Sequence, residues 1–360
     1  MYSKRKAALK QWFKSSKQRV SLTTDIWTAK VTGCSYMVIT AHYIDAYWCL
    51  KKLIIGFKYV TDHKGKTISS TLSECLAEWG IDNVFCVTVD NATANSNGLL
   101  HFEHSFSSLS DEALVMKGEF MHMRCAGHII NLIVKDGLTE VDESIASIRN
   151  GIAYVRSGPI RQQTFEVKVD SGKMKRGSLP LDVPTRWNST YLMLQRALKF
   201  KVAFDKMGFE DKPYNDHFME FDKGKKRVGP PTMDDWRAVE RLEKFLIIFY
   251  NSTLVVSAST TLNAHKCYSE IVNIASSLKL LCNSYDTQLK VKAEEMSRKY
   301  EKYWDGVKNI NKMLIVASIF DPSRKMKFTK LCFEELYGED TVEAKLLHDS
   351  VLTLKSDLFS

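Results

Sequence analysis

The sequence lacks the paired cysteines and the long apolar runs that mark several protein classes. It contains no CxxC pair, so its cysteines predict neither a zinc finger nor a disulfide framework. No apolar run approaches the length of a membrane span, and the opening segment lacks the apolar core of a signal peptide. The eight cysteines are Cys34, Cys49, Cys75, Cys86, Cys125, Cys267, Cys282 and Cys332. We expect reduced thiols in an intracellular protein without a membrane partner.

Acidic residues are fewer than basic ones. The chain has 51 Lys and Arg against 42 Asp and Glu, a formal net charge of +9. This excess favours contact with polyanions but does not by itself identify a nucleic-acid binder. With 360 residues, 44% of them hydrophobic, the chain can bury a sizeable core, and we expect two domains.

Strand-like and helical patterns alternate in the first part of the chain. Three strand-like runs rich in β-branched and aromatic residues come first, and a helix, a strand, a helix, a strand and a helix follow. In chain order these are Arg19–Thr28, Cys34–Ile44, Tyr47–Val60, Thr67–Gly80, Val84–Asp90, Asn97–Phe106, Glu119–Gly127 and His128–Leu138. From about Glu143, helical apolar stripes dominate, separated by basic loops at Glu166–Pro184 and Phe221–Thr232.

Two aspartates stand in the first and fourth of these strands. Asp25 lies in "LTTDIWT" and Asp90 ends "VTVD". The helix between the third and fourth strands lets the fourth lie parallel to the first, which would bring the two carboxylates side by side. Such a pair can hold divalent metals for phosphoryl transfer, as in the RNase H-like arrangement. Alternatively, each aspartate caps a local turn or helix.

Four stretches in this order make the chain recognisable. They are "LTTDIWT", "VTVDNATANS", "RCAGHIINLIV" and "DVPTRWNSTYLML". Together they resemble the hAT superfamily of cut-and-paste transposases, with particular likeness to the plant Ricesleeper and Daysleeper type of domesticated transposase, a BED zinc finger family. The resemblance runs from about Ser21 to Leu336.

The resemblance assigns expected roles to three residue pairs. These pairs are Asp25 with Asp90, Cys125 with His128, and Arg186 with Trp187. The first pair matches two members of the Asp-Asp-Glu catalytic triad, the second a CxxH motif, and the third an Arg-Trp motif that lies near the cleaved DNA end in active relatives. The helical stretch from Thr190 resembles the segment inserted into the family's RNase H-like fold.

We therefore expect an α/β fold in which an RNase H-like mixed sheet is interrupted by an all-helical insertion. The expected division is a basic N-terminal segment over residues 1–20, the RNase H-like domain over 21–142, and a mostly helical insertion region with basic loops over 143–360.

Two parts of the family pattern are missing from the sequence. Neither the Ser-Glu motif that supplies the third carboxylate nor the paired Cys and His of a BED finger is present. Glu103, Glu119 and Glu334 are possible third acids, but no spacing supports any of them. Two carboxylates alone bind Mg²⁺ weakly, because that ion needs octahedral positions filled. We expect a remnant, inactive pair, with Mg²⁺ as cofactor only if the chain is active.

The remaining motifs each have two interpretations. Cys125 and His128 lack a second ligand pair, which favours a packing role over zinc. Trp187 can cover a sheet edge, or it can stack on an unpaired base while Arg186 meets a phosphate. The basic segments Lys4–Lys6, Lys168–Arg176 and Lys223–Arg227 are either solvated linkers or phosphate contacts. Among them we expect DNA contacts from Lys173, Lys175 and Arg176.

The function we predict is that of a hAT-transposase-derived, nuclear DNA-binding protein with a part in transcription regulation and without working transposition chemistry. One alternative is a protein-interaction or dimerisation factor that does not bind DNA. Another is a metal-dependent nuclease completed by a partner's acid. A homodimer is expected only if a longer product carries the family's C-terminal region.

Overall fold

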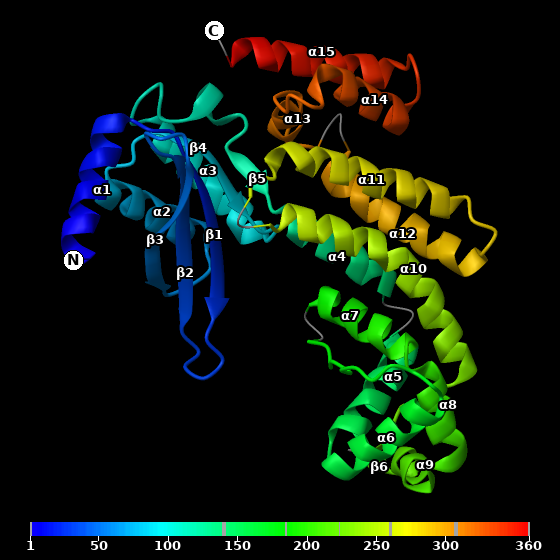
Figure 1. The fold of residues 1–360 in the computed structure, drawn as a ribbon. Helices are drawn as coiled ribbons and strands as arrows, with labels where there is room; N and C mark the ends of the chain where they lie inside the picture. Colours follow the sequence, from blue (N-terminus) through cyan, green and yellow to red (C-terminus); the bar gives the residue numbers. More distant parts are fainter. Residues whose placement is uncertain are drawn as a thin grey trace. The chain divides into compact units, whose positions relative to one another are not determined.

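The computed structural model describes residues 2–138, 142–183, 186–222, 224–258, 261–305 and 309–358 (Figure 1). They form two compact units. Unit 1 comprises Met1–Ile129, Ala258–Tyr268 and Gly306–Ser360, and unit 2 comprises Ile130–Ser257 and Ser269–Asp305. Among the described residues, no helix is both long and apolar enough to cross a membrane.

Unit 1 contains a five-stranded mixed sheet in the order β3-β2-β1-β4-β5. Strands β1, β2 and β3 pair antiparallel, while β4 pairs parallel with both β1 and β5. The strands are β1 (Val20–Thr28), β2 (Ser35–Ile44), β3 (Leu50–Val60), β4 (Val84–Val89) and β5 (His122–Arg124). The mixed sheet that the sequence predicted is confirmed.

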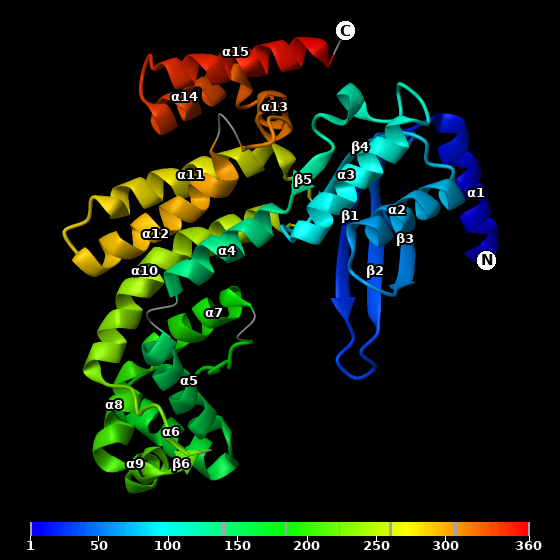
Figure 2. The ribbon, with the colours of Figure 1, turned by 180° about the vertical axis from the view of Figure 1, so that it is seen from behind.

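Alternation along the strands decides which face of the sheet is covered. In β1, Val20 and Leu22 are fully buried, whereas Asp25 and Trp27 on the opposite face are exposed. Helices α1 (Tyr2–Ser16), α2 (Gly65–Trp79) and α3 (Thr93–Ser107) pack with the buried residues into one core. Figure 2 shows α2 and α3 lying over one face of the sheet.

Helix α2 follows its predicted apolar stripe. Its buried residues include Ile68, Leu72, Leu76 and Trp79, spaced three or four positions apart so that they share one face. The helix ends at Gly80, whose φ of 66° belongs to the left-handed conformation that glycine adopts at low cost. The indole nitrogen of Trp79 donates to the carbonyl of Ile55 at 2.6 Å, which ties α2 to β3.

The basic N-terminal segment folds as helix α1, which composition did not predict. Its apolar residues are few, but Phe13 is only 3% exposed and its ring packs against Tyr43 at a centroid distance of 4.9 Å. Lys6 and Lys10 each form an ion pair with Glu78 of α2. The helix is thus stabilised by contacts with β2 and α2 that a scan of local sequence cannot detect.

The end of the chain also belongs to unit 1. The amide of Asn311 donates to the backbone carbonyls of Phe120 and His122, both at 3.2 Å, and so holds this segment against β5. Besides the 3₁₀ turn η1 (Val115–Gly118), the remaining helices that lie wholly in unit 1 are α13 (Met313–Ile319), α14 (Lys325–Tyr337) and α15 (Val342–Asp357).

Unit 2 is helical apart from a two-stranded hairpin. Helix α10 begins with a capping box between Thr232 and Asp235, and the buried Trp236 anchors its first turn. The helices are α5 (Asp142–Arg156), α6 (Pro159–Ser171), α7 (Trp187–Leu198), α8 (Lys201–Glu210), α9 (Lys212–Met219), α10 (Met233–Val256) and α12 (Thr287–Trp304). The hairpin is β6 (Phe221–Asp222) with β7 (Lys225–Lys226), and α4 (Ala126–Leu138) and α11 (Ala264–Cys282) each run from unit 1 into unit 2.

The boundaries between these units differ from the domain boundaries predicted at positions 20 and 142. Helix α1 packs into the core of the sheet and the helices after residue 306 group with unit 1, whereas composition grouped residues 143–360 together. The physical reason is that an apolar stripe identifies a helix and its buried face but not the element that covers that face.

Candidate functional site

The candidate site lies where β1 and β4 run side by side. Their parallel register pairs Thr23 with Thr88. Asp25 and Asp90 each follow two residues later, so the register brings them to the same level and, by strand alternation, to the same face. The structure shows β1 and β4 as adjacent parallel strands, with Asp25 in β1 and Asp90 directly after β4. The catalytic ancestry of the pair stays a prediction.

The two carboxylates have different surroundings. Asp25 is exposed, and within the described part of the chain its Oδ1 accepts one hydrogen bond, from the neighbouring backbone amide of Ile26 at 2.9 Å. Oδ1 of Asp90 accepts from the backbone amide of Ala92 at 2.9 Å and from the side-chain amide of Asn95 at 2.6 Å. Asp90 therefore fixes the turn that leads into α3, and Asp25 makes no such local contribution.

The CxxH motif lies at the same end of the sheet. The backbone amide of Cys125 donates to the carbonyl of Val89 at 2.8 Å, which places Cys125 beside the turn at Asp90. His128 follows in the first turn of α4. In that turn the backbone amide of Ile129 donates a hydrogen bond to the carbonyl of Cys125. The motif thus joins β5 to α4 next to the carboxylate pair, which fits a fold-supporting role.

None of the three candidate acids completes the pair. Glu103 lies ten residues into α3, about 15 Å along the helix from its start, and burial raises the pKa of its carboxyl. Glu119 precedes β5, at the opposite end of the parallel strands from Asp90. Glu334 pairs with Lys330 within α14 at 3.5 Å.

The described residues do not fit a two-metal site. Among them, no group of three or more His, Cys, Asp or Glu side chains is placed to hold a metal ion. One oxygen of Asp90 already serves the turn through Ala92 and Asn95. Two divalent ions need more anionic oxygen ligands than Asp25 and Asp90 provide.

Comparisons with known proteins match nearly the whole chain to one family. Residues 23–120 match the ZBED1 RNase-like domain, residues 123–245 the ZBED1 RNase-like helical domain, and residues 265–359 the hAT-like transposase, RNase-H fold. The first match spans β1 to α3, which carry both aspartates. The chain belongs to the hAT family of transposase-related proteins.

Curated relatives agree with this assignment. The hAT chain is 28% identical to the zinc finger BED domain-containing protein RICESLEEPER 2 of Oryza sativa, and the alignment covers 98% of the hAT chain. It is 32% identical to a candidate AC transposase of Zea mays, in an alignment that covers 94% of the hAT chain. It is 28% identical to the BED protein DAYSLEEPER of Arabidopsis thaliana over 89%. It spans only 47%, 40% and 44% of these relatives, less than half of each.

The Arg-Trp motif of the hAT chain lies in unit 2. Arg186 is the N-cap residue of α7, and Trp187 is the first residue of that helix. The indole is 4% exposed, so it belongs to the core of unit 2. Stacking on a base would require it to leave this environment, and that role stays a prediction.

The basic loop predicted from Glu166 begins inside helix α6, which extends to Ser171. Arg176 pairs with Glu166 at 3.0 Å and with Asp170, so its charge is offset. Lys173 and Lys175 are exposed, and no ion pair involving either is found among the described residues. The two lysines are therefore the cations of this loop that remain available to a phosphate.

Sequence patterns missed an aromatic cluster near Asp25. On the exposed face of the sheet, Trp27 lies beside Tyr36 and Phe57, with ring centroids 6.0 Å and 5.3 Å away. Tyr36 in turn contacts Tyr59. The register of the strands pairs Trp27 with Tyr36 and Tyr36 with Tyr59. The sequence predicted the strands but not this register, so the cross-strand pairs could not be foreseen.

Proposed function

We propose that this hAT chain is a DNA-binding protein of transposase descent that contacts phosphates largely independently of sequence and does not itself cut DNA. The observation that carries the proposal is the pairing of β1 with β4, which brings Asp25 and Asp90 to one level of the sheet. In the hAT family this arrangement serves phosphodiester chemistry on DNA, and a net charge of +9 favours a polyanionic partner.

The proposal that the chain does not cut DNA rests on the ligand set. A two-metal displacement holds its ions roughly 3.5–4 Å apart, one at the attacking and one at the leaving oxygen. Within the described residues, Asp25 and Asp90 have no third acid beside them. Ions held so loosely would be misplaced, and small misplacements can cost on the order of a hundredfold in rate.

The cellular role follows from the proposed partner. A DNA-binding remnant of a transposase would act in the nucleus, and binding without cleavage is suited to transcription regulation. Dimerisation through a C-terminal region in a longer product remains part of this proposal.

A binding and cleavage experiment tests the proposal. We expect weak binding to duplexes of unrelated sequence, with an affinity that falls steeply as salt rises. We also expect no cleavage of intact or pre-nicked duplexes in Mn²⁺, a permissive ion for carboxylate sites. Undetectable binding at low salt would favour the interaction-factor alternative. Cleavage that disappears in Asp90→Asn would show that a third acid exists, supplied by this chain or by a partner copy.

A further inference from the structure

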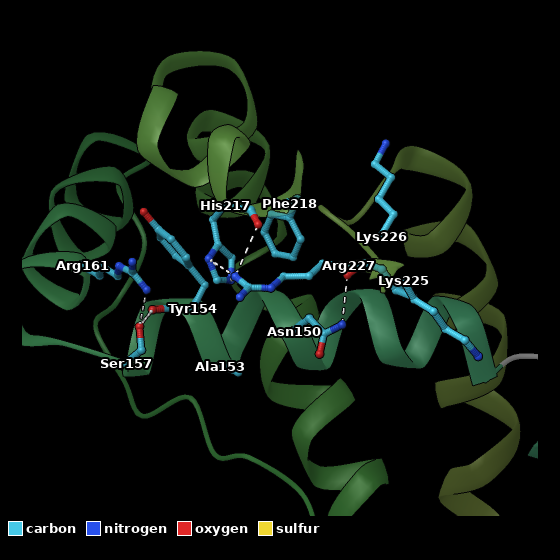
Figure 3. A pocket seen from close by; sticks show the side chains of 11 residues that line it. Asn150, Ala153, Tyr154, Ser157, Arg161, His217, Phe218, Lys225, Lys226 and Arg227 are labelled. Carbon is cyan, nitrogen blue, oxygen red and sulfur yellow. Dashed lines mark hydrogen bonds between the residues drawn. The ribbon is translucent and has the colours of Figure 1, made fainter. Parts of the chain in front are cut away.

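Basic side chains surround a pocket in unit 2 (Figure 3). The pocket has a volume of about 440 Å³ and is lined by residues of α5, α6, α9 and the segment around β7. Its cationic residues are Arg161, Lys225, Lys226 and Arg227, and no carboxylate occurs among its described lining residues. A concave site with positive charge of this kind concentrates anions.

Within the described residues, Arg161 is held in place without a carboxylate partner. Its Nη1 donates to Oγ of Ser157 at 2.6 Å, and its guanidinium carbon lies 4.2 Å from the ring centroid of Tyr154. Among the described residues, no ion pair to Arg161 is found. A guanidinium has five N–H donors, so most of those on Arg161 remain available to a ligand.

Arg227 approaches the pocket from the other side. Figure 3 shows Arg161 next to Tyr154 and Arg227 next to His217, with the two rings between the arginines. Nη1 of Arg227 lies 2.5 Å and 3.0 Å from the two ring nitrogens of His217. Its ion-pair partner, Glu220 at 3.1 Å, is largely exposed and lies outside the lining. The amide of Asn150 donates to the carbonyl of Val228, which fixes the backbone next to Arg227.

The environment of His217 favours its neutral form. Burial, followed by the charges of Arg227 and Arg161, lowers the pKa of His217, and Glu220 opposes this only in part. The imidazole is therefore neutral near pH 7 and does not repel Arg227. Both arginines can then direct their remaining donors toward an anion.

We propose that this pocket binds a phosphate group of a DNA strand, with Arg161 and Arg227 as its two principal ligands. The planar fork of arginine matches the oxygens of a phosphate, and charge-assisted pairs of this kind are the stronger hydrogen bonds. Lys225 and Lys226 are exposed in the lining of the pocket. In this proposal they contact the neighbouring phosphates of the strand. The choice of DNA as the source of the phosphate rests on the proposed function.

A pair of matched double variants tests the pocket. Arg161→Gln with Arg227→Gln removes two charges from it, and Lys244→Gln with Lys290→Gln removes two exposed charges of α10 and α12 outside it. We expect the first variant to bind duplex DNA about tenfold more weakly, with a salt slope lower by about one unit per lost contact. The control should change affinity by less than about twofold, since neither lysine lines the pocket and salt screens exposed charges.

Two further variants separate the effect of bidentate arginine contacts from the effects of charge and of misfolding. Arg161→Lys with Arg227→Lys keeps the charge but loses bidentate contact, so we expect an affinity between those of the wild type and the glutamine variant. Lys225→Gln with Lys226→Gln changes two exposed side chains and should weaken binding even if the arginine variants fold poorly.

The outcomes distinguish failure of the pocket from failure of DNA binding. DNA affinity that is equal in wild type, the arginine variants and the Lys225/Lys226 variant overturns the pocket and leaves the proposed function standing. If the wild type binds no DNA, calorimetric titration with inorganic pyrophosphate decides whether the pocket is a phosphate site. Pyrophosphate binding that Arg161→Gln with Arg227→Gln abolishes would support the phosphate site and assign it to a small phosphorylated ligand. If the wild type binds neither DNA nor pyrophosphate, the proposed phosphate site is overturned.

Discussion

At the scale of single residues, Asp25 and Asp90 share a level of the sheet but not a structural role. Asp90 accepts two hydrogen bonds that start α3, whereas Asp25 accepts one from its own neighbour along the chain. The sequence left open whether these aspartates are site residues or caps. The structure shows that Asp90 is a turn-forming residue whatever its catalytic ancestry.

Substitution can separate the two roles of Asp90. Asp90→Ala removes both hydrogen bonds and should destabilise unit 1 by about 1 kcal/mol, which lowers Tm by about 2–4 °C for a unit of this size. Asp90→Asn keeps an accepting oxygen and should retain most of that stability. Asp25→Ala, at an exposed position, should stay within about 0.5 kcal/mol of wild type. Thermal unfolding followed by circular dichroism measures all three, and equal losses in Asp25→Ala and Asp90→Ala would contradict the assignment.

At the scale of elements, one acidic residue of α2 pairs with two lysines of helix α1. Glu78 receives Lys6 at 2.9 Å and Lys10 at 3.4 Å from α1, and Lys58 at 3.2 Å from β3. Helix α1 itself contains no acidic residue. Glu78 therefore offsets several positive charges at the junction of α1, α2 and β3.

The pH dependence of stability tests this junction. Hydrogen bonds from Lys6 and Lys58 are the main causes that lower the pKa of Glu78 from 4.5 to about 2. A carboxyl whose pKa is lowered by folding contributes stability above its unfolded pKa and loses that contribution as pH falls. Glu78→Gln should therefore lower the free energy of unfolding of unit 1 at pH 7 by on the order of 1 kcal/mol after solvent screening, and its Tm with it. The difference from wild type should shrink between pH 4.5 and 2.

A neighbouring residue of α2 provides the control. Glu74 is exposed on the same helix, and no ion pair to it is found in the described part of the chain. Glu74→Gln should therefore leave both the Tm at pH 7 and its pH dependence close to wild type. A pH profile of Glu78→Gln parallel to that of wild type would show that the lysines do not stabilise the junction.

At the scale of the whole molecule, the net charge of +9 is not equally available to a partner. Arg176 is offset by Glu166 and Asp170, while Lys173 and Lys175 have no such partners in the described residues. Counting basic residues in a loop therefore overstates its capacity for phosphate contact. Binding depends on the cations that can exchange their counterions for DNA phosphates.

Salt-dependent DNA binding measures this difference. Neutralising Lys173, Lys175 and Arg176 together should weaken binding uniformly across sequences. We expect the Lys173→Gln and Lys175→Gln double variant to account for most of the effect, with a decrease of up to about 1.8 in the slope of log K against log salt. Arg176→Gln alone should change the slope little. An equal decrease from Arg176→Gln would show that its ion pairs open on binding.

Much of the fold and the carboxylate pair could be predicted from sequence because their signals are local. The period of apolar residues identified the strands, α2 and the helical region, and the crossover helix required β4 to run parallel to β1. The motifs around Asp25, Asp90, Cys125 and Trp187 were sufficient for the family. None of these conclusions required knowing which distant residues touch.

Only the tertiary structure decided the features that depend on contacts between distant segments. The docking of α1 depends on Phe13 against Tyr43 and on the ion pairs of Glu78, and the burial of Trp187 depends on the core of unit 2. The pocket takes Arg161 from α6, His217 from α9 and Arg227 from beyond β7. Local periodicity indicates which face of an element is buried, but which charges meet, and which stay unpaired, is set by long-range packing.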